Sequence, residues 1–305
     1  QVAALSTTQV KGLAATQLSA LGATDVAEFT ATQISAMTTS QIGALSATGF
    51  SALDATQVAA LDTTQVKSIT ATQLRGLETT DIAELSATQI GALTPSQIGA
   101  LSATNVAALD ATQVAALSTT QLKALTTTQL KALETTDIAE LSATQVGALS
   151  AAQVGALSST SLASLDVTQI GALSAAQIGA LSNTSLSGLD GTQIGALTTT
   201  QVGGLTTTQL RSLSTTDFAE LTSTQIGALS AGQIGSLTAT NLASLDGTQV
   251  AALSTTQVKG LATTQLSALG ATDVQEFTAT QIGALSNAQL ASVTPTGISA
   301  LDATQ

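Results

Sequence analysis

The side chains of this chain that could take part in chemistry are hydroxyls, carboxylates and a few amines. The 305 residues include no His and no Cys, so the usual general base near neutral pH and the thiol nucleophile are both missing. A Ser–Lys dyad is the remaining arrangement to consider, but each Lys stands at a position that other repeats fill with Gly or Ala. No Gly-rich phosphate loop is present. We therefore predict no catalytic residue, no cofactor and no enzymatic activity.

Carboxylates near the amino terminus raise the question of calcium. Asp25, Glu28, Asp54 and Asp62 supply oxygen atoms of the kind that calcium prefers. Their spacing differs from that of an EF-hand loop, and each Asp has a sufficient structural role at the start of a helix. We therefore predict no metal site.

The elements that would position these side chains follow an eight-residue repeat, or octad, that continues without insertion or deletion. Large apolar residues stand at every eighth position from Leu5, and a second apolar series starts at Val2 with the same period. Repetition at a fixed period is typical of a solenoid. The core must be aliphatic, because the chain has four Phe, no Trp and no Tyr.

The spacing within the octad excludes both a simple strand and a continuous helix. The two apolar series are separated alternately by three and by five residues, and a strand would place such neighbours on opposite faces. In a continuous α-helix, eight residues at about 100° each would rotate the apolar stripe by roughly 80° per repeat. The chain must therefore bend once per octad.

The bend coincides with a helix-capping signal. The residue after the Leu is Ser, Thr or Asp in 32 of 38 octads, and Gln usually stands three residues later. This is the pattern of a capping box, in which the hydroxyl or carboxylate and the Gln side chain each satisfy one backbone N–H. Leu149 and Val154 illustrate the flanking apolar pair of a hydrophobic staple.

Both prolines agree with one short helix per octad. Pro95 and Pro295 follow the capping residues Thr94 and Thr294 and so fall at the first helical position, where proline is favoured. We predict an all-α solenoid or superhelix of very short capped helices, each about one and a half turns long. The alternative is a β-solenoid with Thr-Gln-Val-Gly as its strand, since β-branched residues favour strands.

A longer period overlies the octads. Asp replaces Gln in five acidic octads, and three of their four intervals equal seven octads, a 56-residue unit; these residues are Asp25, Asp81, Asp137, Asp217 and Asp273. The fourth interval is longer by a 24-residue duplication, in which residues 150–173 are repeated closely at 174–197. We predict a single continuous solenoid over residues 1–305. We also hypothesise that seven octads make whole superhelical turns, which would place Asp25 and Asp81 on one face.

The charges restrict the partners. The formal net charge is −12, which argues against binding nucleic acid or an anionic membrane. Ser, Thr and Gln interrupt the uncharged stretch between Glu140 and Asp166, so we predict no membrane insertion. The seven basic residues all follow the apolar residue of the helix and should face solvent, with ion pairs between repeats or contacts with neighbouring rods as alternatives; they are Lys11, Lys67, Arg75, Lys123, Lys131, Arg211 and Lys259.

A row of threonines is the main candidate binding surface. Thr precedes Gln in most octads, from Thr8 through Thr56 to Thr304. A solenoid would present these Thr and Gln side chains as a ladder. An alternative function is therefore a binding module that recognises carbohydrate or ice.

The octads also resemble those of a known group of proteins. Ala143-Thr144-Gln145-Val146-Gly147-Ala148-Leu149-Ser150 is similar to octapeptide-repeat tracts in very large, adhesin-like surface or secreted proteins of Gram-negative bacteria. The resemblance covers the whole chain and implies an extracellular or cell-surface stalk, sheath or filament. The glycine-aspartate nonapeptides of calcium-binding secreted proteins are absent, so the resemblance does not imply calcium-dependent folding.

We therefore predict a structural repeat protein that acts as an extracellular spacer or filament subunit. The chain opens with Gln1 in the middle of a repeat and without a leader, so we expect a segment of a longer protein. Neither end carries a polar capping repeat, which solenoid ends usually need. We therefore expect flanking domains, or self-association end to end or side by side.

Overall fold

The computed structural model describes residues 1–305 and consists of helices without any strand. The predicted all-α fold is confirmed, and the β-solenoid alternative is wrong. The chain divides into two compact units, Gln1–Ala156 (unit 1) and Leu157–Gln305 (unit 2), which we describe separately. A single continuous array over both units stays a prediction.

Unit 1 contains one short 3-10 helix and nineteen α-helices, at close to one helix per octad. Their bounds are η1 Val2–Ala4, α1 Thr7–Lys11, α2 Ala15–Ala20, α3 Ala23–Ala27, α4 Ala31–Ala36, α5 Thr39–Ala44, α6 Ala47–Ser51, α7 Ala55–Ala59, α8 Thr63–Val66, α9 Ala71–Gly76, α10 Thr79–Glu84, α11 Ala87–Ala92, α12 Pro95–Ala100, α13 Ala103–Ala107, α14 Ala111–Ala115, α15 Thr119–Ala124, α16 Thr127–Ala132, α17 Thr135–Ala139, α18 Ala143–Ala148 and α19 Ala151–Ala156.

Unit 2 continues the same pattern with eighteen α-helices. Their bounds are α20 Ser159–Ala163, α21 Val167–Gly171, α22 Ala175–Gly179, α23 Asn183–Leu186, α24 Gly191–Gly195, α25 Thr199–Gly203, α26 Thr207–Ser212, α27 Thr215–Ala219, α28 Ser223–Gly227, α29 Ala231–Ser236, α30 Ala239–Ala243, α31 Gly247–Ala251, α32 Thr255–Lys259, α33 Thr263–Leu266, α34 Ala271–Gln275, α35 Ala279–Ala284, α36 Asn287–Ser292 and α37 Pro295–Ala300.

Helix α5 shows how a helix can end at two extended residues rather than at a left-handed glycine. Between α5 and α6, Leu45 has φ −58° and ψ 140°, and the next residue, Ser46, has φ −61° and ψ 157°. No residue of the chain has a positive φ, so the bends do not use the glycine C-cap that is common at helix ends. The Oγ of Ser46 accepts a hydrogen bond from Gly49 N at 3.0 Å and starts the next helix. Pro95 and Pro295 begin α12 and α37, as predicted.

Successive octads wind into a superhelix within each unit. In unit 1, helices pack on the third helix before and after them, as in the pairs α1·α4, α2·α5 and α3·α6. In unit 2 the pairs α20·α23 and α22·α25 repeat this arrangement. Each octad therefore contacts only octads nearby in sequence, which is the pattern of a repeat protein.

Both apolar series of the octad are buried and form the core of each unit. Leu74, from the series that lies inside the helices, has no exposed surface, and Leu77, from the series that ends them, is 7% exposed. Full burial of such a side chain stabilises the fold by about 1.5–3 kcal/mol. An aliphatic core of this kind was predicted from the composition, and stacking compensates for helices too short to be stable alone.

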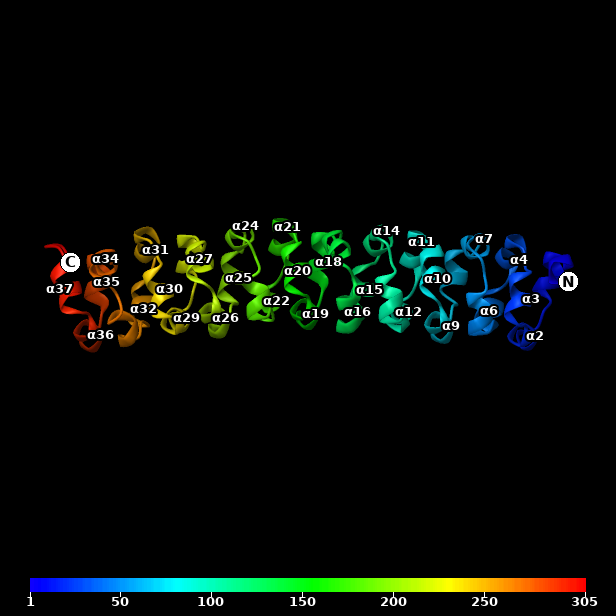
Figure 1. The fold of residues 1–305 in the computed structure, drawn as a ribbon, viewed down its shortest axis with the longest axis horizontal. Helices are drawn as coiled ribbons and strands as arrows, with labels where there is room; N and C mark the ends of the chain where they lie inside the picture. Colours follow the sequence, from blue (N-terminus) through cyan, green and yellow to red (C-terminus); the bar gives the residue numbers. More distant parts are fainter. The chain divides into compact units, whose positions relative to one another are not determined.

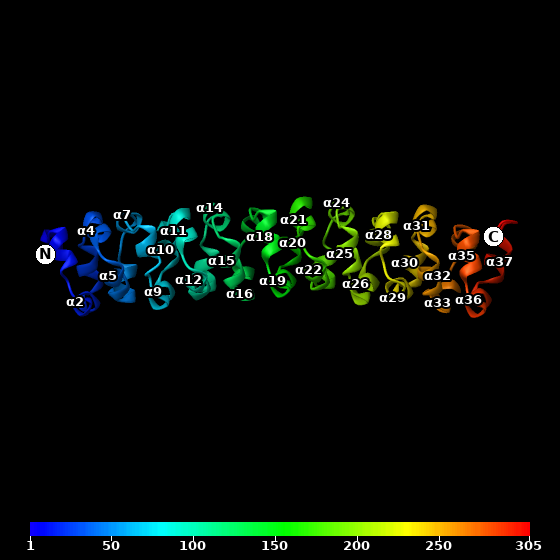
Figure 2. The same cartoon turned by 180° about the vertical axis from the view of Figure 1, so that it is seen from behind.

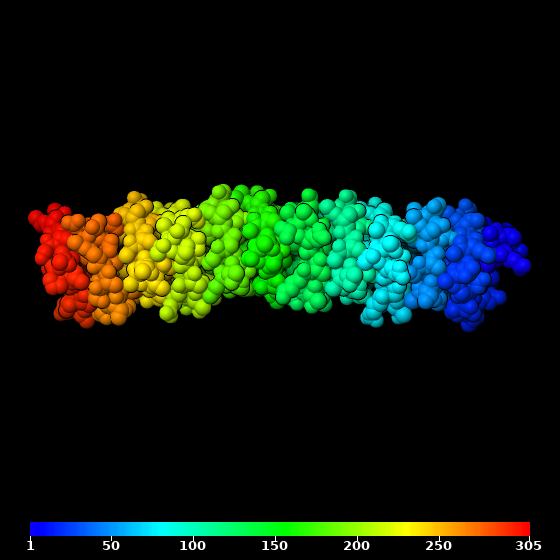
Figure 3. Space-filling model, in the orientation of Figure 1, coloured from blue at the N-terminus to red at the C-terminus, as the bar shows by residue number.

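Helices seven places apart share an edge of unit 1. In Figures 1 and 2, α4, α11 and α18 lie along one edge, and α2, α9 and α16 lie along the opposite edge. This agrees with the hypothesis that seven octads make whole superhelical turns. The visible face of each unit in Figure 3 shows no deep hollow.

Candidate functional site

The most elaborate polar arrangement in the molecule surrounds the Gln at the third position of each helix. In α5, the Oε1 of Gln41 accepts from Thr38 N at 2.9 Å, and Thr38 Oγ1 accepts from Gln41 N at 3.3 Å, which completes the predicted capping box. The Nε2 of Gln41 also donates to Val10 O at 2.8 Å and to Leu13 O at 3.0 Å. The side chain therefore caps its own helix and bonds the preceding superhelical turn.

The bonds between turns recur at fixed separations. In unit 1, Gln73 Nε2 donates to Ile42 O and Leu45 O, at sequence separations of 31 and 28 residues. A step of 28 residues is three and a half octads. Two such steps equal the period of seven octads, so residues seven octads apart, such as Asp25 and Asp81, lie on one face.

We call the buried glutamines that make these bonds the glutamine ladder; Gln305 makes the same bonds but is only partly buried. Its members are Gln33, Gln41, Gln57, Gln65, Gln73, Gln89, Gln97, Gln113, Gln121, Gln129, Gln145 and Gln153 in unit 1, and Gln193, Gln201, Gln209, Gln225, Gln233, Gln249, Gln257, Gln265, Gln281 and Gln289 in unit 2. Each is at most 8% exposed. Such burial requires that the amide be hydrogen-bonded.

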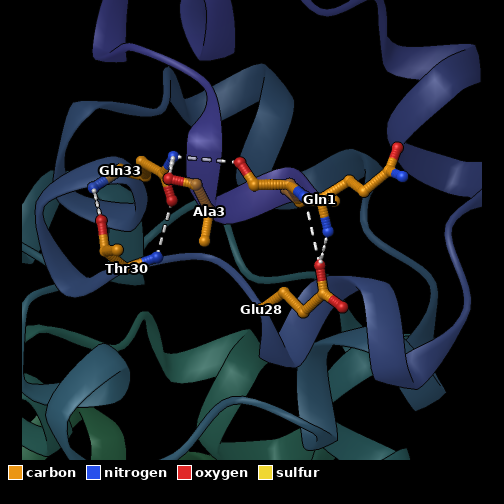
Figure 4. A network of polar contacts seen from close by, with 6 residues as sticks. Gln1, Ala3, Glu28, Thr30 and Gln33 are labelled. Atoms are coloured by element: carbon orange, nitrogen blue, oxygen red, sulfur yellow. Dashed lines mark hydrogen bonds and ion pairs between the residues drawn. The ribbon is translucent and has the colours of Figure 1, made fainter.

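The ladder begins in the first turn of the chain, as Figure 4 shows. Gln33 Nε2 donates to Val2 O at 3.2 Å and to Leu5 O at 2.6 Å, while Gln33 Oε1 accepts from Thr30 N at 2.7 Å. Beside it, Glu28 accepts from Val2 N at 3.1 Å and forms an ion pair with the terminal ammonium group. This hydrogen-bonded ion pair lowers the pKa of the Glu28 carboxyl.

Residues that replace Gln keep only part of its role. Asn105 Nδ2 donates to Leu77 O at 3.1 Å and Leu74 O at 3.4 Å, but Asn105 makes no capping box. Asp81 does the reverse: its Oδ2 accepts from Glu78 N at 2.8 Å, and an ionised carboxylate has no N–H to donate to the preceding turn. The Gln side chain is long enough to reach both partners, and it carries an acceptor for the capping box and a donor for the bond to the preceding turn.

Carboxylates gather where Asp interrupts the ladder. Glu84, at the end of α10, has an oxygen, Oε2, that is buried without a hydrogen-bond partner. Burial is the largest cause that raises the pKa of the Glu84 carboxyl, followed by the negative charges of Asp81 and Asp54. Ser51 Oγ donates to Asp81 from the preceding turn. Asp54 lies at the N-cap of α7, on which α10 packs.

Two further acidic octads show the same effect. Burial raises the pKa of Asp137, which is 7% exposed, and the charges of Glu134 and Asp110 act in the same direction, against the lowering by the Glu134 backbone N–H. In unit 2, burial and then the charges of Asp273 and Asp246 raise the pKa of Glu276. The acidic octads are therefore positions where the ladder is broken and negative charge is partly buried.

The candidate calcium ligands are engaged in backbone hydrogen bonds or an ion pair. Asp54 Oδ1 accepts from Gln57 N at 2.9 Å, and Asp62 Oδ1 accepts from Thr64 N and Gln65 N, both at 2.8 Å. Asp25 Oδ2 accepts from Gly22 N at 3.1 Å. No three acidic side chains of the chain form a group suited to a metal ion.

Comparison with known families matches the octads to a described repeat. Five segments match the family model of the ALTTAQ repeat, at residues 66–103, 95–127, 104–135, 130–166 and 205–239. The chain carries ALTTAQ repeat tracts. Together the matched segments cover less than half of the chain, and each is longer than the 28-residue step of the superhelix. No curated protein matches the chain.

The basic residues of the ALTTAQ tracts and of the rest of the chain face solvent, as predicted. All seven are exposed, and none forms an ion pair; the terminal ammonium group forms the one ion pair in the chain, with Glu28. Ion pairs between repeats, an alternative raised by the sequence, are therefore absent within the chain. In unit 1, Arg75 and Lys131 belong to α9 and α16, on the edge opposite α7 and α14, whose N-caps are Asp54 and Asp110.

The Thr and Gln side chains that were predicted to form one surface differ in exposure: the Thr side chains are exposed and most of the Gln side chains are buried. The threonines before Gln, such as Thr56, Thr64 and Thr72, are exposed. The ladder glutamines of the ALTTAQ tracts are buried and bonded to the backbone, so the expectation that Gln would line a surface is wrong. Only the threonine row is available to a ligand.

The remaining features of the chain offer no further polar site. A small cavity in unit 2 has an entirely apolar lining: Leu266, Leu269, Val274, Phe277, Ile282, Leu285 and Val293. No side chain there could orient or activate a substrate. None of the helices has the length and apolar character needed to cross a membrane.

The second role of Gln was missed in the sequence. The capping box accounted for its Oε1 alone, and it also accounts for Asp at the same position. The signal that could have revealed the bond between turns is the marked preference for Gln over Asp or Glu, because an amide, unlike an ionised carboxylate, can donate a hydrogen bond as well as accept one.

Proposed function

We propose that the chain is a structural spacer or stalk outside the cell, extended in whole octads. The supporting observation is the glutamine ladder, which bonds most octads to backbone 28 to 31 residues earlier in the sequence. In a fold stabilised by neighbouring units, copies can be added or removed without disturbing distant contacts. The 24-residue duplication at 150–173 and 174–197 is such an addition.

Deletion of residues 174–197 tests this proposal. We expect the variant to keep its helical content per residue, measured by circular dichroism, and to have a smaller maximum dimension in solution scattering. Deletion of residues 174–193 is the matched control, because a loss that is not a multiple of eight breaks the octad. Loss of the fold in the first variant, or an unchanged maximum dimension, would contradict the spacer function.

The extracellular location requires a separate experiment. Antibodies against the threonine row should label intact cells that produce the native protein, without permeabilisation. Labelling that requires permeabilised cells would refute the proposed location and leave the structural role untouched.

Side-by-side association of copies would turn such a spacer into a filament or sheath, and the charged edges of unit 1 support it. α9 and α16, which carry Arg75 and Lys131, lie on the edge opposite α7 and α14. The N-caps of α7 and α14 are Asp54 and Asp110, and the two basic and the two acidic residues are each seven octads apart. Facing edges of two copies would bring opposite charges together, at about 0–1 kcal/mol per exposed pair. Because these contacts are screened by salt, sedimentation should show association at low salt that high salt abolishes. A single species at all salt concentrations would exclude it.

The exposed threonine row favours a second candidate function, the binding of carbohydrate or ice. Thr56, Thr64 and Thr72 present one hydroxyl per octad to solvent. A ligand that binds only the folded state raises its unfolding midpoint. A purely structural protein should show no such shift with soluble glycans and no inhibition of ice recrystallisation.

A further inference from the structure

The contact between α7 and α10 in unit 1 differs from most other contacts between turns because an acidic octad interrupts the ladder there. Asp81 occupies the position of the ladder glutamine and is capped to its own helix through Glu78 N. It has no N–H with which to bond the preceding turn. Its link to that turn is the hydrogen bond donated by Ser51 Oγ.

Glu84 brings a second carboxylate to the same contact. Its Oε2 is buried and has no partner, a costly state for a charged oxygen. Asp54, at the N-cap of α7, adds a further negative charge that acts on Glu84 together with that of Asp81. The basic residue nearest in sequence, Arg75 in α9, is exposed and forms no ion pair.

The other elements in contact with α10 do not compensate for this charge. α13 and α6, the helix that ends at Ser51, contain no titratable residue, and the nearest one beyond α13 is Asp110, the N-cap of α14. At the N-cap of α10, the remaining acidic residue is Glu78, which is exposed. Every titratable group that faces Glu84 is therefore acidic.

We propose that the contact between α7 and α10 is a proton-dependent joint: it is tight when Glu84 is protonated and loosens when Glu84 is ionised. A neutral carboxyl removes the charge repulsion from Asp81 and Asp54 and the cost of burying a charged oxygen. The joint is local, because neighbouring contacts on either side retain their ladder glutamines, Gln73 and Gln89.

The sign of the pH dependence follows from the environment of Glu84. Its pKa in the folded chain lies above the ordinary value of 4.5, so the folded state binds the proton more tightly than the unfolded state does. The stability that protonation contributes is fully present below the ordinary pKa and is lost as the pH rises through the raised value.

Hydrogen exchange of the intact chain tests the proposal at the joint itself. Protection factors, corrected for the intrinsic rate at each pH, should be higher near pH 5 than near pH 7.5 for the amides of α7 and α10. Glu84→Gln should raise protection near pH 7.5 several-fold, because it removes a partly buried charge, and should remove the difference between the two pH values.

Glu140→Gln is the matched control, because Glu140 occupies the same octad position seven octads later and is exposed. It should leave the protection of α7 and α10 unchanged. Asp54→Asn, which keeps a capping oxygen, should change protection in the same direction as Glu84→Gln by removing one opposing charge. The proposal is overturned if Glu84→Gln lowers protection near pH 7.5, if the pH difference persists in that variant, or if Glu140→Gln has an equal effect.

Discussion

Gln73 Nε2 donates a hydrogen bond to Ile42 O at 2.8 Å across 31 residues of sequence. The same side chain accepts from Thr70 N at 2.7 Å within its own helix. One amide thus joins the capping of a helix to the stacking of superhelical turns. The natural replacements at this position, Asn105 and Asp81, each retain one of the two functions.

Substitutions of Gln73 should separate these two functions. Gln73→Asn keeps an N–H donor and loses the capping box, which should cost about 0.5–2 kcal/mol. Gln73→Glu keeps the acceptor but places a carboxylate at a site that is 1% exposed, and an unpaired buried charge should cost about 3–5 kcal/mol near neutral pH. Urea unfolding followed by circular dichroism measures both. An equal cost for the two variants near pH 7.5 would contradict the importance of the donor.

An amide at Asp137 should restore a missing bond. Asn at the equivalent position donates to backbone 28 residues earlier in Asn105 and Asn241, so Asp137→Asn should bond Leu109 O, at the equivalent place in the preceding turn. Because the pKa of Asp137 is raised, its stabilising protonated form is lost as the pH rises. The variant should therefore be more stable than the parent near pH 7.5, with the gain shrinking towards pH 4.

Asp25→Asn is the control for this prediction. Asp25 is exposed, and residues 1–305 contain no backbone 28 residues before it that an amide could bond. The control should not gain stability near pH 7.5. Equal gains in the two variants would show that loss of negative charge, rather than a bond between turns, stabilises the chain.

Two glycines of unit 2 should respond to a methyl group in opposite ways. A Cβ at Gly260 would lie 2.6 Å from Ala231 O, whereas a Cβ at Gly232 would meet nothing within 4 Å. Gly260→Ala should destabilise the fold by about 1–3 kcal/mol through overpacking. Gly232→Ala should stabilise it by about 0.4–1 kcal/mol through the unfolded state. Thermal unfolding measures the stability of both variants. If Gly260→Ala stabilised the fold, the close approach of turns at this glycine would be refuted.

Shortening a core side chain should reduce the free energy of unfolding most where superhelical turns cover that side chain on both sides. Leu74 is fully buried and Leu290, in the same octad position, is 39% exposed. Leu74→Ala should cost about 2–5 kcal/mol, and Leu290→Ala clearly less. Comparable losses in urea unfolding would show that stability does not depend on stacking at these positions.

The sequence carried enough information to predict the local fold but not the step between turns. The local features follow from interactions between residues that are close in sequence, so the pattern of one octad is enough to predict them. They include the bend at Leu45 and Ser46, the capping box of Gln41 and the position of Pro95. The partner of Gln41 Nε2 is Val10 O, 31 residues away. An eight-residue repeat is compatible with many superhelical steps. The step of 28 residues is therefore set by packing between turns and not by the octad itself.

The candidate site illustrates the same limit. Asp81 stands in the place of the capping-box Gln and accepts a hydrogen bond from Glu78 N, which is a contact within one octad. Its meeting with Glu84 and Asp54 depends on the superhelical step and could not be inferred from the octad alone. The close approach at Gly204 depends on the same step, because a Cβ there would lie 2.7 Å from Ala175 O in another turn.

The central claim, that turns meet at a step of three and a half octads, can be tested by a disulfide in this cysteine-free chain. A Cβ at Gly188 would lie 3.4 Å from the Cβ of Ser159 in the preceding turn, a separation close to that of a disulfide. Oxidation should crosslink Ser159→Cys with Gly188→Cys nearly completely, while Ser159→Cys with Ala180→Cys, one octad closer, should stay reduced. Preferential crosslinking of the second pair would contradict the step and the glutamine ladder built on it.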